Sequence, residues 1–284
     1  MYSIPYYQYS FTLPENVDKD IIISILADYD FEGFVETDTG FLAYVPSDKD
    51  QPHLWMPEIQ SICPTFKTDK EIIEPKNWNE EWEKNYDIAK INDHCEIYAP
   101  FHTINLNIKY PIFIEPKMSF GTGHHATTFM MANLLFDIQN ELKDKKVIDV
   151  GCGTGILGIV AKKLGASSVW FIDNDPICIE NTKENILKNF PSEQISNIPI
   201  LLSDIQQVRQ NYPNEKWDII IANIQKNVIL NDLPHYKDLL LPNAYLLISG
   251  ILKEYQQEII TAAQPLKHIK TFNKDEWIAL LFQN

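Results

Sequence analysis

Apolar and polar residues alternate over the first 73 residues in short runs that predict a small α+β domain. Apolar residues recur at every second position in a half-buried strand and at every third or fourth position in a helix, so the two kinds of element can be told apart. The resulting order, β-α-β-β-α-β, is that of a ferredoxin-like module. The expected strands are Tyr6–Leu13, Gly33–Thr37, Phe41–Val45 and Phe66–Ile73, and the expected helices are Asp18–Tyr29 and His53–Ile62.

A polar stretch, residues 74–90, follows this domain. Trp78, Trp82 and Tyr86 occur in it at intervals of four residues, which places their rings on one face of a helix. We therefore expect a linker helix whose aromatic face packs against a domain.

From residue 91 to residue 284, apolar strands alternate with helices. This alternation predicts an α/β domain with a parallel sheet that is covered by helices on both faces. Asp175 precedes one of the helices and is expected to cap it. The expected strands are Cys95–Ala99, Leu106–Tyr110, Ile112–Glu115, Lys146–Val150, Ser168–Ile172, Ile198–Leu202, Trp217–Ala222 and Tyr245–Ser249, and the expected helices include Ala126–Leu142, Leu157–Leu164 and Pro176–Asn189.

The composition, 45% hydrophobic and 22% charged over 284 residues, is that of a globular protein. The chain has no run of 18 apolar residues, and its first ten residues lack the layout of a signal peptide. We therefore expect a cytoplasmic protein without a membrane partner. The four cysteines, Cys63, Cys95, Cys152 and Cys178, form no C-x-x-C pair, so we expect reduced thiols and no metal site.

The charge of the chain bears on its partners. With a net charge of −15 and Arg209 as its only arginine, the sequence disfavours binding to phosphate backbones, so no direct nucleic-acid binding is expected. More than half of this charge lies in residues 1–73, where four lysines stand against 13 acidic residues, a net charge of −9. An acidic surface of this kind attracts a basic partner.

The strongest chemical signal is the run V-I-D-V-G-C-G-T-G at residues 147–155. A buried strand leads into a glycine-rich turn and then into a helix, whose first N–H groups have no partner inside the helix. Gly151 and Gly153 let the backbone approach a ligand closely. In α/β domains such a turn lies at the carboxyl edge of the sheet, where ligands bind.

Asp173 ends the next strand, 22 residues beyond Gly151. An acid at this place can accept hydrogen bonds from the two hydroxyls of a ribose, which indicates a ligand that contains a nucleoside. Residues 153–158 also satisfy G-x-G-x-x-G, so a nicotinamide-dependent dehydrogenase is an alternative. However, Gly151 follows the strand directly, and the spacing D-x-G-x-G-x-G resembles motif I of the class I methyltransferases, whose loop wraps around S-adenosylmethionine.

Two further segments carry candidate site residues. The run F-G-T-G-H-H-A-T-T, residues 120–128, ends at the start of a helix, where Thr128 suits contact with a ligand. In the same run His125 is a candidate base, a substrate contact or a packed ring. The run A-N-I, residues 222–224, ends a later strand, and the side-chain oxygen of Asn223 can accept a hydrogen bond from an amine or from the ligand.

These motifs, followed by L-I-S-G-I-L at residues 247–252 and D-E-W-I-A-L at residues 275–280, resemble in their order the PrmA family, the methyltransferases of large-subunit ribosomal protein eleven. The resemblance covers most of residues 78–284. It implies a class I (Rossmann-like) methyltransferase domain at residues 91–284 and a substrate-recognition domain at residues 1–73, joined by a flexible linker. It also implies methyl transfer from S-adenosylmethionine to lysine ε-amines and to the N-terminal α-amine of that ribosomal protein.

By position, the resemblance assigns Thr128, Gly151, Asp173 and Asn223 to contact with the cofactor, and we expect Gly153 of the same loop to share this role. Asn223 is also expected to act in catalysis as an acceptor for the substrate amine, with His125 as the candidate base.

The chain departs from the family pattern at two places. The family reads T-H-P where this chain has His124, His125 and Ala126, and it has small or apolar residues where Gln225, Lys226 and Asn227 stand here. These differences bear on the shape of the substrate pocket.

Other interpretations stay open. A class I methyltransferase could act on another protein or on a small molecule, although a small-molecule enzyme needs no separate recognition domain. A scaffold that binds a partner without chemistry is disfavoured by the intact glycine loop together with Asp173 and Asn223.

Overall fold

The computed structural model describes residues 4–14, 17–74, 83, 85–117, 121–191 and 197–284. The chain divides into two compact units, residues 1–85 and 86–284, and each is described by itself. The predicted linker helix falls mainly outside the described residues. Its last two residues, Ala89 and Lys90, lie in a strand, so a helix does not extend to residue 90 as predicted. The domain boundaries drawn from the sequence stay predictions.

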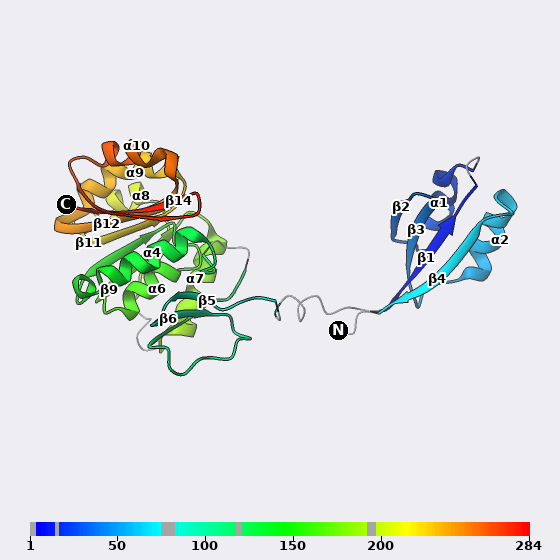
Figure 1. Ribbon diagram of the computed structural model, residues 1–284, viewed down its shortest axis with the longest axis horizontal. Coiled ribbons are helices and arrows are strands. Elements are labelled where there is room, and N and C mark those ends of the chain that lie inside the picture. Colours follow the sequence, from blue (N-terminus) through cyan, green and yellow to red (C-terminus); the bar gives the residue numbers. More distant parts are fainter. Residues whose placement is uncertain (1–3, 15–16, 75–82, 84, 118–120, 192–196) are drawn as a thin grey trace. The chain divides into compact units, whose positions relative to one another are not determined.

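Up to residue 74, the described part of the N-terminal unit forms a four-stranded antiparallel sheet with the strand order β2-β3-β1-β4 and two helices (Figure 1). This order, with its β-α-β-β-α-β connectivity, is the ferredoxin-like arrangement that the pattern predicted. The elements are β1 (Tyr6–Thr12), α1 (Lys19–Ala27), β2 (Gly33–Thr37), β3 (Gly40–Pro46), α2 (Pro52–Ile62) and β4 (Lys67–Ile73).

Aromatic side chains fill the core of this unit. The ring of Trp55, on α2, is fully buried and meets Tyr9 of β1 edge-on, with 5.0 Å between the ring centroids. Phe11, two residues along β1 and therefore on the same face of the strand, stacks on Phe41 of β3 at 4.9 Å. Alternation along β1 thus determines which face of the sheet the helices cover.

The second unit contains a seven-stranded sheet with the order β10-β9-β8-β11-β12-β14-β13 and a separate three-stranded sheet, β5-β6-β7. The strands of the two sheets are β5 (Ala89–Asn92), β6 (Cys95–Tyr98), β7 (Tyr110–Phe113), β8 (Lys146–Val150), β9 (Ser168–Asp173), β10 (Ile200–Leu202), β11 (Trp217–Asn223), β12 (Leu240–Leu252), β13 (Lys267–Lys274) and β14 (Trp277–Gln283). The helices are α4 (Ala126–Asp137), α5 (Gln139–Leu142), α6 (Ile156–Lys163), α7 (Pro176–Asn189), α8 (Ile205–Asn211), α9 (Lys226–Leu239), η2 (Lys253–Tyr255) and α10 (Gln256–Ala263).

Helices cover both faces of the large sheet (Figure 1). Val147 of β8 faces the core formed with α4, α6 and α7, whereas Ile148 faces the core formed with α8, α9 and α10. The same alternation holds for Ile219 and Ile220 of β11. Because both faces are buried there, the central strands β8 and β11 carry apolar residues on both faces, as the sequence pattern indicated.

Three details of the prediction are corrected. The sheet is mixed, because β14 runs antiparallel to β12 and β13 antiparallel to β14. The strand predicted at Leu106–Tyr110 is a loop up to Lys109, and Leu106 is 92% exposed, so its apolar side chain has no sheet face to cover. The helix predicted at Ala126–Leu142 is interrupted at Ile138 and continues as α5.

None of the helices that the structure describes combines the length and the apolar character needed to cross a bilayer.

Gly158 of α6 lies against the ring of Phe171, and a Cβ atom at residue 158 would come within 2.2 Å of it. We predict that Gly158→Ala lowers the stability of the chain by about 1–3 kcal/mol, because the overpacking outweighs the better helix propensity of alanine. Thermal unfolding checks this, and adding Phe171→Leu should recover part of the loss. A variant as stable as the wild type would contradict the contact.

Candidate active site

A cavity of about 630 Å³ lies at the carboxyl ends of β8, β9 and β11. This is the edge at which open α/β sheets bind their ligands. All six residues singled out from the sequence line this one cavity, although they come from four separate segments of the chain. They are His125, Thr128, Gly151, Gly153, Asp173 and Asn223.

The loop after β8 has no room for a side chain at Gly151. Gly151 has a φ of +65°, and a Cβ atom there would lie 2.3 Å from Cγ2 of Ile224, the residue after β11. Gly250, with a φ of +85°, is as tightly constrained, because its Cβ would lie 2.2 Å from the carbonyl oxygen of Ile224. Glycine is therefore needed at both positions for the conformation and for the space.

Asp173, at the end of β9, is 9% exposed and is held by the backbone. Its Oδ2 accepts a hydrogen bond from the N–H of Gly153 at 2.9 Å, and its Oδ1 accepts one from the N–H of Asp175 at 3.0 Å. A carboxylate has about four acceptor positions, so capacity remains for the two hydroxyls of a ribose. The first bond also ties the acid to the glycine loop. Asp175 itself caps α7, as predicted, by accepting from the N–H of Ile177 at 2.8 Å.

Two buried oxygens in the cavity lack a hydrogen-bond partner among the described residues. They are Oγ1 of Thr128 in the first turn of α4 and Oδ1 of Asn223 at the end of β11. A buried polar atom without a partner costs about 1–3 kcal/mol, which a bound ligand can offset. Both positions were predicted to contact the cofactor, and their roles stay predictions.

His125 forms the N-cap of α4. Its Nδ1 accepts the N–H of Thr127 at 3.3 Å and lies 2.8 Å from the hydroxyl of that residue, and its ring meets Trp277 edge-on at 5.1 Å. A neutral imidazole that accepts through Nδ1 carries its proton on Nε2. The cap therefore gives His125 the structural, packed role that the sequence left open, while the role of a base stays a prediction.

Acidic side chains dominate the charge of the cavity. Asp149, Asp173, Asp204 and Asp232 line it, whereas its described lining includes no lysine or arginine. The pKa of Asp149 is raised to about 7, chiefly by burial and to a smaller extent by the neighbouring Asp173, against the opposing effect of the hydrogen bond from the N–H of Gly158 at 2.9 Å. Such a cavity favours a ligand with positive charge and disfavours a pyrophosphate.

Sequence reasoning assigned no role to several lining residues. Asp149 belongs to the glycine motif and could have been found there. Ser203 and Asp204 follow the short strand β10, and only their place in the sheet reveals them. Trp277 begins β14, and because this strand is antiparallel and pairs Trp277 with Leu252, its first residue lies at the same edge as the last residues of the parallel strands.

Burial also determines the protonation state of Cys152, which lies in the glycine loop and lines the cavity. The pKa of its thiol is raised well above the ordinary value, chiefly by burial. The thiol is therefore neutral at physiological pH and is no nucleophile.

The residues present fit a cationic nucleoside ligand. Gly151 and Gly153 line the cavity without side chains, Asp173 keeps acceptor capacity for a ribose, and the buried oxygens of Thr128 and Asn223 have no hydrogen-bond partner among the described residues. The sheet order with its antiparallel β14, together with this loop and this acid, defines a class I methyltransferase.

The comparison with known proteins narrows the class to one family. The sequence model described as ribosomal protein L11 methyltransferase (PrmA) matches residues 18–284, and the chain belongs to this family. The ribosomal protein L11 methyltransferase of Porphyromonas gingivalis is 36% identical over 98% of this chain and 97% of its own length. That of Bacteroides thetaiotaomicron is 36% identical over 98% of this chain and 99% of its own length.

A solved structure supports the same assignment. The ribosomal protein L11 methylase of Lactobacillus delbrueckii subsp. bulgaricus is 25% identical, with a TM-score of 0.60. The match covers 69% of this chain and 98% of that one.

The buried Asp149 makes a pH-dependent prediction. Its pKa is about 7 in the folded protein against 3.8 in the unfolded chain, so the folded state keeps the proton longer. The stability that this proton provides is present below pH 3.8 and is lost as the pH rises to about 7. Asp149→Asn keeps an acceptor for Gly158 and cannot ionise.

We therefore expect the stability of Asp149→Asn, relative to the wild type, to increase from pH 4 to pH 7 and then to level off. One pKa unit corresponds to about 1.4 kcal/mol, so the gain is about 4 kcal/mol at most. Urea unfolding at a series of pH values measures it. A difference that does not vary with pH would show that Asp149 is ionised throughout.

Proposed function

We propose that this chain transfers methyl groups from S-adenosylmethionine to ribosomal protein L11, at lysine ε-amines and at the N-terminal α-amine. The observation that carries the proposal is an acid-lined cavity with two unpaired oxygens, in a chain that matches the L11 methyltransferase family over residues 18–284. The relatives named above cover nearly the whole chain, so the proposal extends to both units.

S-adenosylmethionine supplies a methyl group that is activated by its bond to a sulfonium. Gly151 and Gly153 would allow the loop to lie against this cofactor, Asp173 would accept from its ribose hydroxyls, and Thr128 and Asn223 would satisfy its polar groups. Asp173 and Asp204, which line the cavity, favour its positive charge.

The residues of the chain must also hold the acceptor amine in line with the methyl group. Positioning of this kind can supply roughly 7–11 kcal/mol of the barrier at best. The amine reacts only when it is neutral, and an unperturbed lysine has a pKa of about 10.4. A desolvated site, with Asn223 as an uncharged acceptor, would favour the neutral form. His125 is the candidate base, and to accept a proton at Nδ1 it would have to release the N–H of Thr127.

The N-terminal unit is proposed to bind the protein substrate. The net charge of −9 over residues 1–73 suits a basic ribosomal protein, and a small-molecule acceptor would need no such unit. The same acidic balance supports the absence of direct binding to nucleic acid. Because the proposed substrate is a ribosomal protein, we expect the enzyme to be located in the cytoplasm.

Transfer of labelled methyl groups to ribosomal proteins from an unmethylated source, resolved by mass, tests the proposal. Label on L11, in steps of one methyl group at amines, is the expected result. Label on another protein would support methyl transfer to a protein but would assign a different substrate. Binding of S-adenosylmethionine without transfer to any ribosomal protein would overturn the assignment of a protein substrate and point to a small molecule.

The docking role of the N-terminal unit predicts an effect of charge reversal. Asp69 and Glu71 on β4 are exposed, and no ion pair of either is among the described contacts. Replacing both by lysine should raise the KM for L11 about 3- to 10-fold, more at low salt, and leave the Kd for S-adenosylmethionine unchanged.

Reversal of two exposed acids in the second unit, Asp93 and Glu141, is the matched control, since it changes the net charge equally. Steady-state kinetics with both variants gives the answer. Equal KM values in the two variants would contradict a docking surface on the N-terminal unit.

A further inference from the structure

Three asparagines follow one another at intervals of four on α7, so they share one face of the helix. They are Asn181, Asn185 and Asn189, and we refer to them as the asparagine row. Asn181 and Asn185 are fully buried. Burying an amide is costly unless its groups are paired, so the pairing partners indicate what the row is for.

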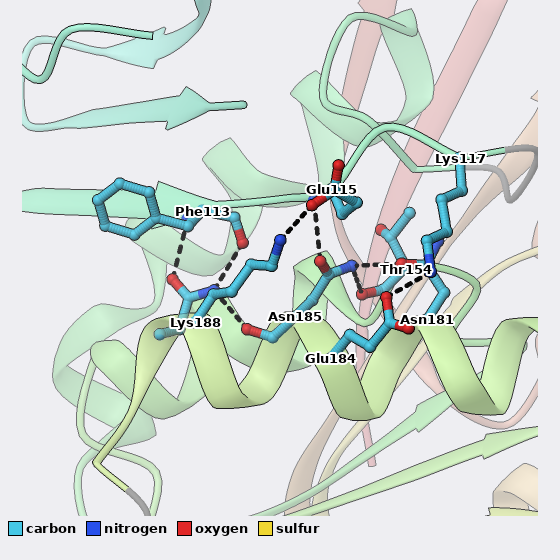
Figure 2. A network of polar contacts seen from close by, with 9 residues as sticks. Phe113, Glu115, Lys117, Thr154, Asn181, Glu184, Asn185 and Lys188 are labelled. Carbon is cyan, nitrogen blue, oxygen red and sulfur yellow. Dashed lines mark hydrogen bonds and ion pairs between the residues drawn. The ribbon is translucent and has the colours of Figure 1, made fainter. Parts of the chain in front are cut away.

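On one side the helix holds the glycine loop. Nδ2 of Asn185 donates to the carbonyl oxygen of Thr154 at 2.9 Å (Figure 2), and the hydroxyl of Thr182 donates to the carbonyl oxygen of Gly153 at 2.9 Å. Thr182 is also fully buried. Two consecutive carbonyl groups of the loop are thus fixed on α7. Because a peptide is planar, each bond also fixes the direction of the N–H group of the next residue.

On the other side the helix holds the chain that follows β7. Oδ1 of Asn185 accepts from the N–H of Glu115 at 2.8 Å (Figure 2). Asn189 binds both backbone groups of Phe113, accepting from its N–H at 3.0 Å and donating to its carbonyl oxygen at 2.7 Å. Ion pairs between Lys188 and Glu115, and between Lys117 and Glu184, flank these bonds.

The orientation of the Asn185 amide follows from its partners. Only an oxygen can accept from the N–H of Glu115, and only a nitrogen can donate to the carbonyl oxygen of Thr154. The second N–H of the amide donates to Oδ1 of Asn181 at 3.0 Å, so every hydrogen of the group is used. Leucine or alanine at residue 185 would leave all three partners without this bond.

Thr154 connects this network to the cavity. Its hydroxyl donates to the carbonyl oxygen of Gly121 at 2.6 Å, while its own carbonyl is held by Asn185. Gly121 and Gly153 both line the cavity. Asn185 therefore contacts both chain segments whose continuations form the cofactor site, and it does so without lining the cavity itself.

We propose that Thr182 and Asn185 of α7 are positioning residues for cofactor binding, which hold the carbonyl groups of the glycine loop away from the cofactor. This rests on the proposed function, since it takes S-adenosylmethionine to be the ligand. Asn189, one turn further along the same face, anchors only Phe113 and the helix backbone.

The two asparagines provide a matched test. Asn185→Asp keeps the acceptor for Glu115 and loses the donors to Thr154 and Asn181. Asn189→Asp keeps the acceptor for Phe113 and loses the donors to the carbonyl oxygens of Phe113 and Asn185. Each substitution thus retains one bond and removes two, so both should lower the melting temperature.

The measurement is the Kd of S-adenosylmethionine by calorimetry on the full chain, well below the melting temperature of each variant. We expect Asn185→Asp to raise the Kd roughly 10- to 100-fold and Asn189→Asp to change it by less than about 3-fold. Equal effects of the two substitutions on the Kd would overturn the inference and leave the row a purely structural feature. A wild type that binds no S-adenosylmethionine would overturn the proposed function with it.

A second pair keeps the test valid if Asn185→Asp does not fold. Thr182→Val preserves the shape of the side chain and removes the donor to Gly153, whereas Thr182→Ser keeps the hydroxyl. The valine variant should weaken cofactor binding and raise the KM for S-adenosylmethionine without raising the KM for L11, and the serine variant should restore both. Equal cofactor affinities of the two variants would contradict a role for the hydroxyl.

Discussion

The cavity depends on one steric constraint, the close approach of Ile224 to two glycines. The side chain of Ile224 lies where a Cβ of Gly151 would be, and its backbone lies where a Cβ of Gly250 would be. The ends of β8, β11 and β12 can therefore come together only with glycine on both sides. Gly151, Ile224 and Gly250 all line the cavity, and their contact brings Asn223 to the same edge as the glycine loop. The positions of the polar groups in the cavity therefore depend on the steric fit between these strand ends.

The sequence could predict what depends on neighbours in the chain. β8, α7 and the cap at Asp175 have the predicted bounds, since strand pattern, Pro176 and a capping carboxylate are local signals. The glycine loop, Asp173 and Asn223 could be found because each ends a strand, and ends of parallel strands meet at one edge. The predicted strand at Leu106 was wrong because an apolar run does not show whether a sheet edge is available to pair with it.

Long-range partners could not be predicted. Trp277 reaches the cavity only because β14 inserts antiparallel beside β12, and a pattern of apolar residues carries no information on strand direction. The asparagine row was also missed, since asparagines on a helix are ordinary surface residues until their partners are known. Asn185 and Glu115 are 70 residues apart, and nothing local in either segment points to the other.

In the proposed function, the uncharged side chain at residue 223 is what makes an acidic cavity compatible with the chemistry of an amine. Acids near the glycine loop favour a cationic cofactor, but an acid beside the acceptor would hold a lysine in its protonated, unreactive form. Asn223 offers an oxygen without a negative charge, and Asp149 and Asp173 are engaged by N–H groups of the backbone on the loop side of the cavity. The carboxylate of Asp173 is thereby held on the loop side, where the cofactor is proposed to bind, and the side chain at residue 223, which is proposed to meet the amine, adds no negative charge.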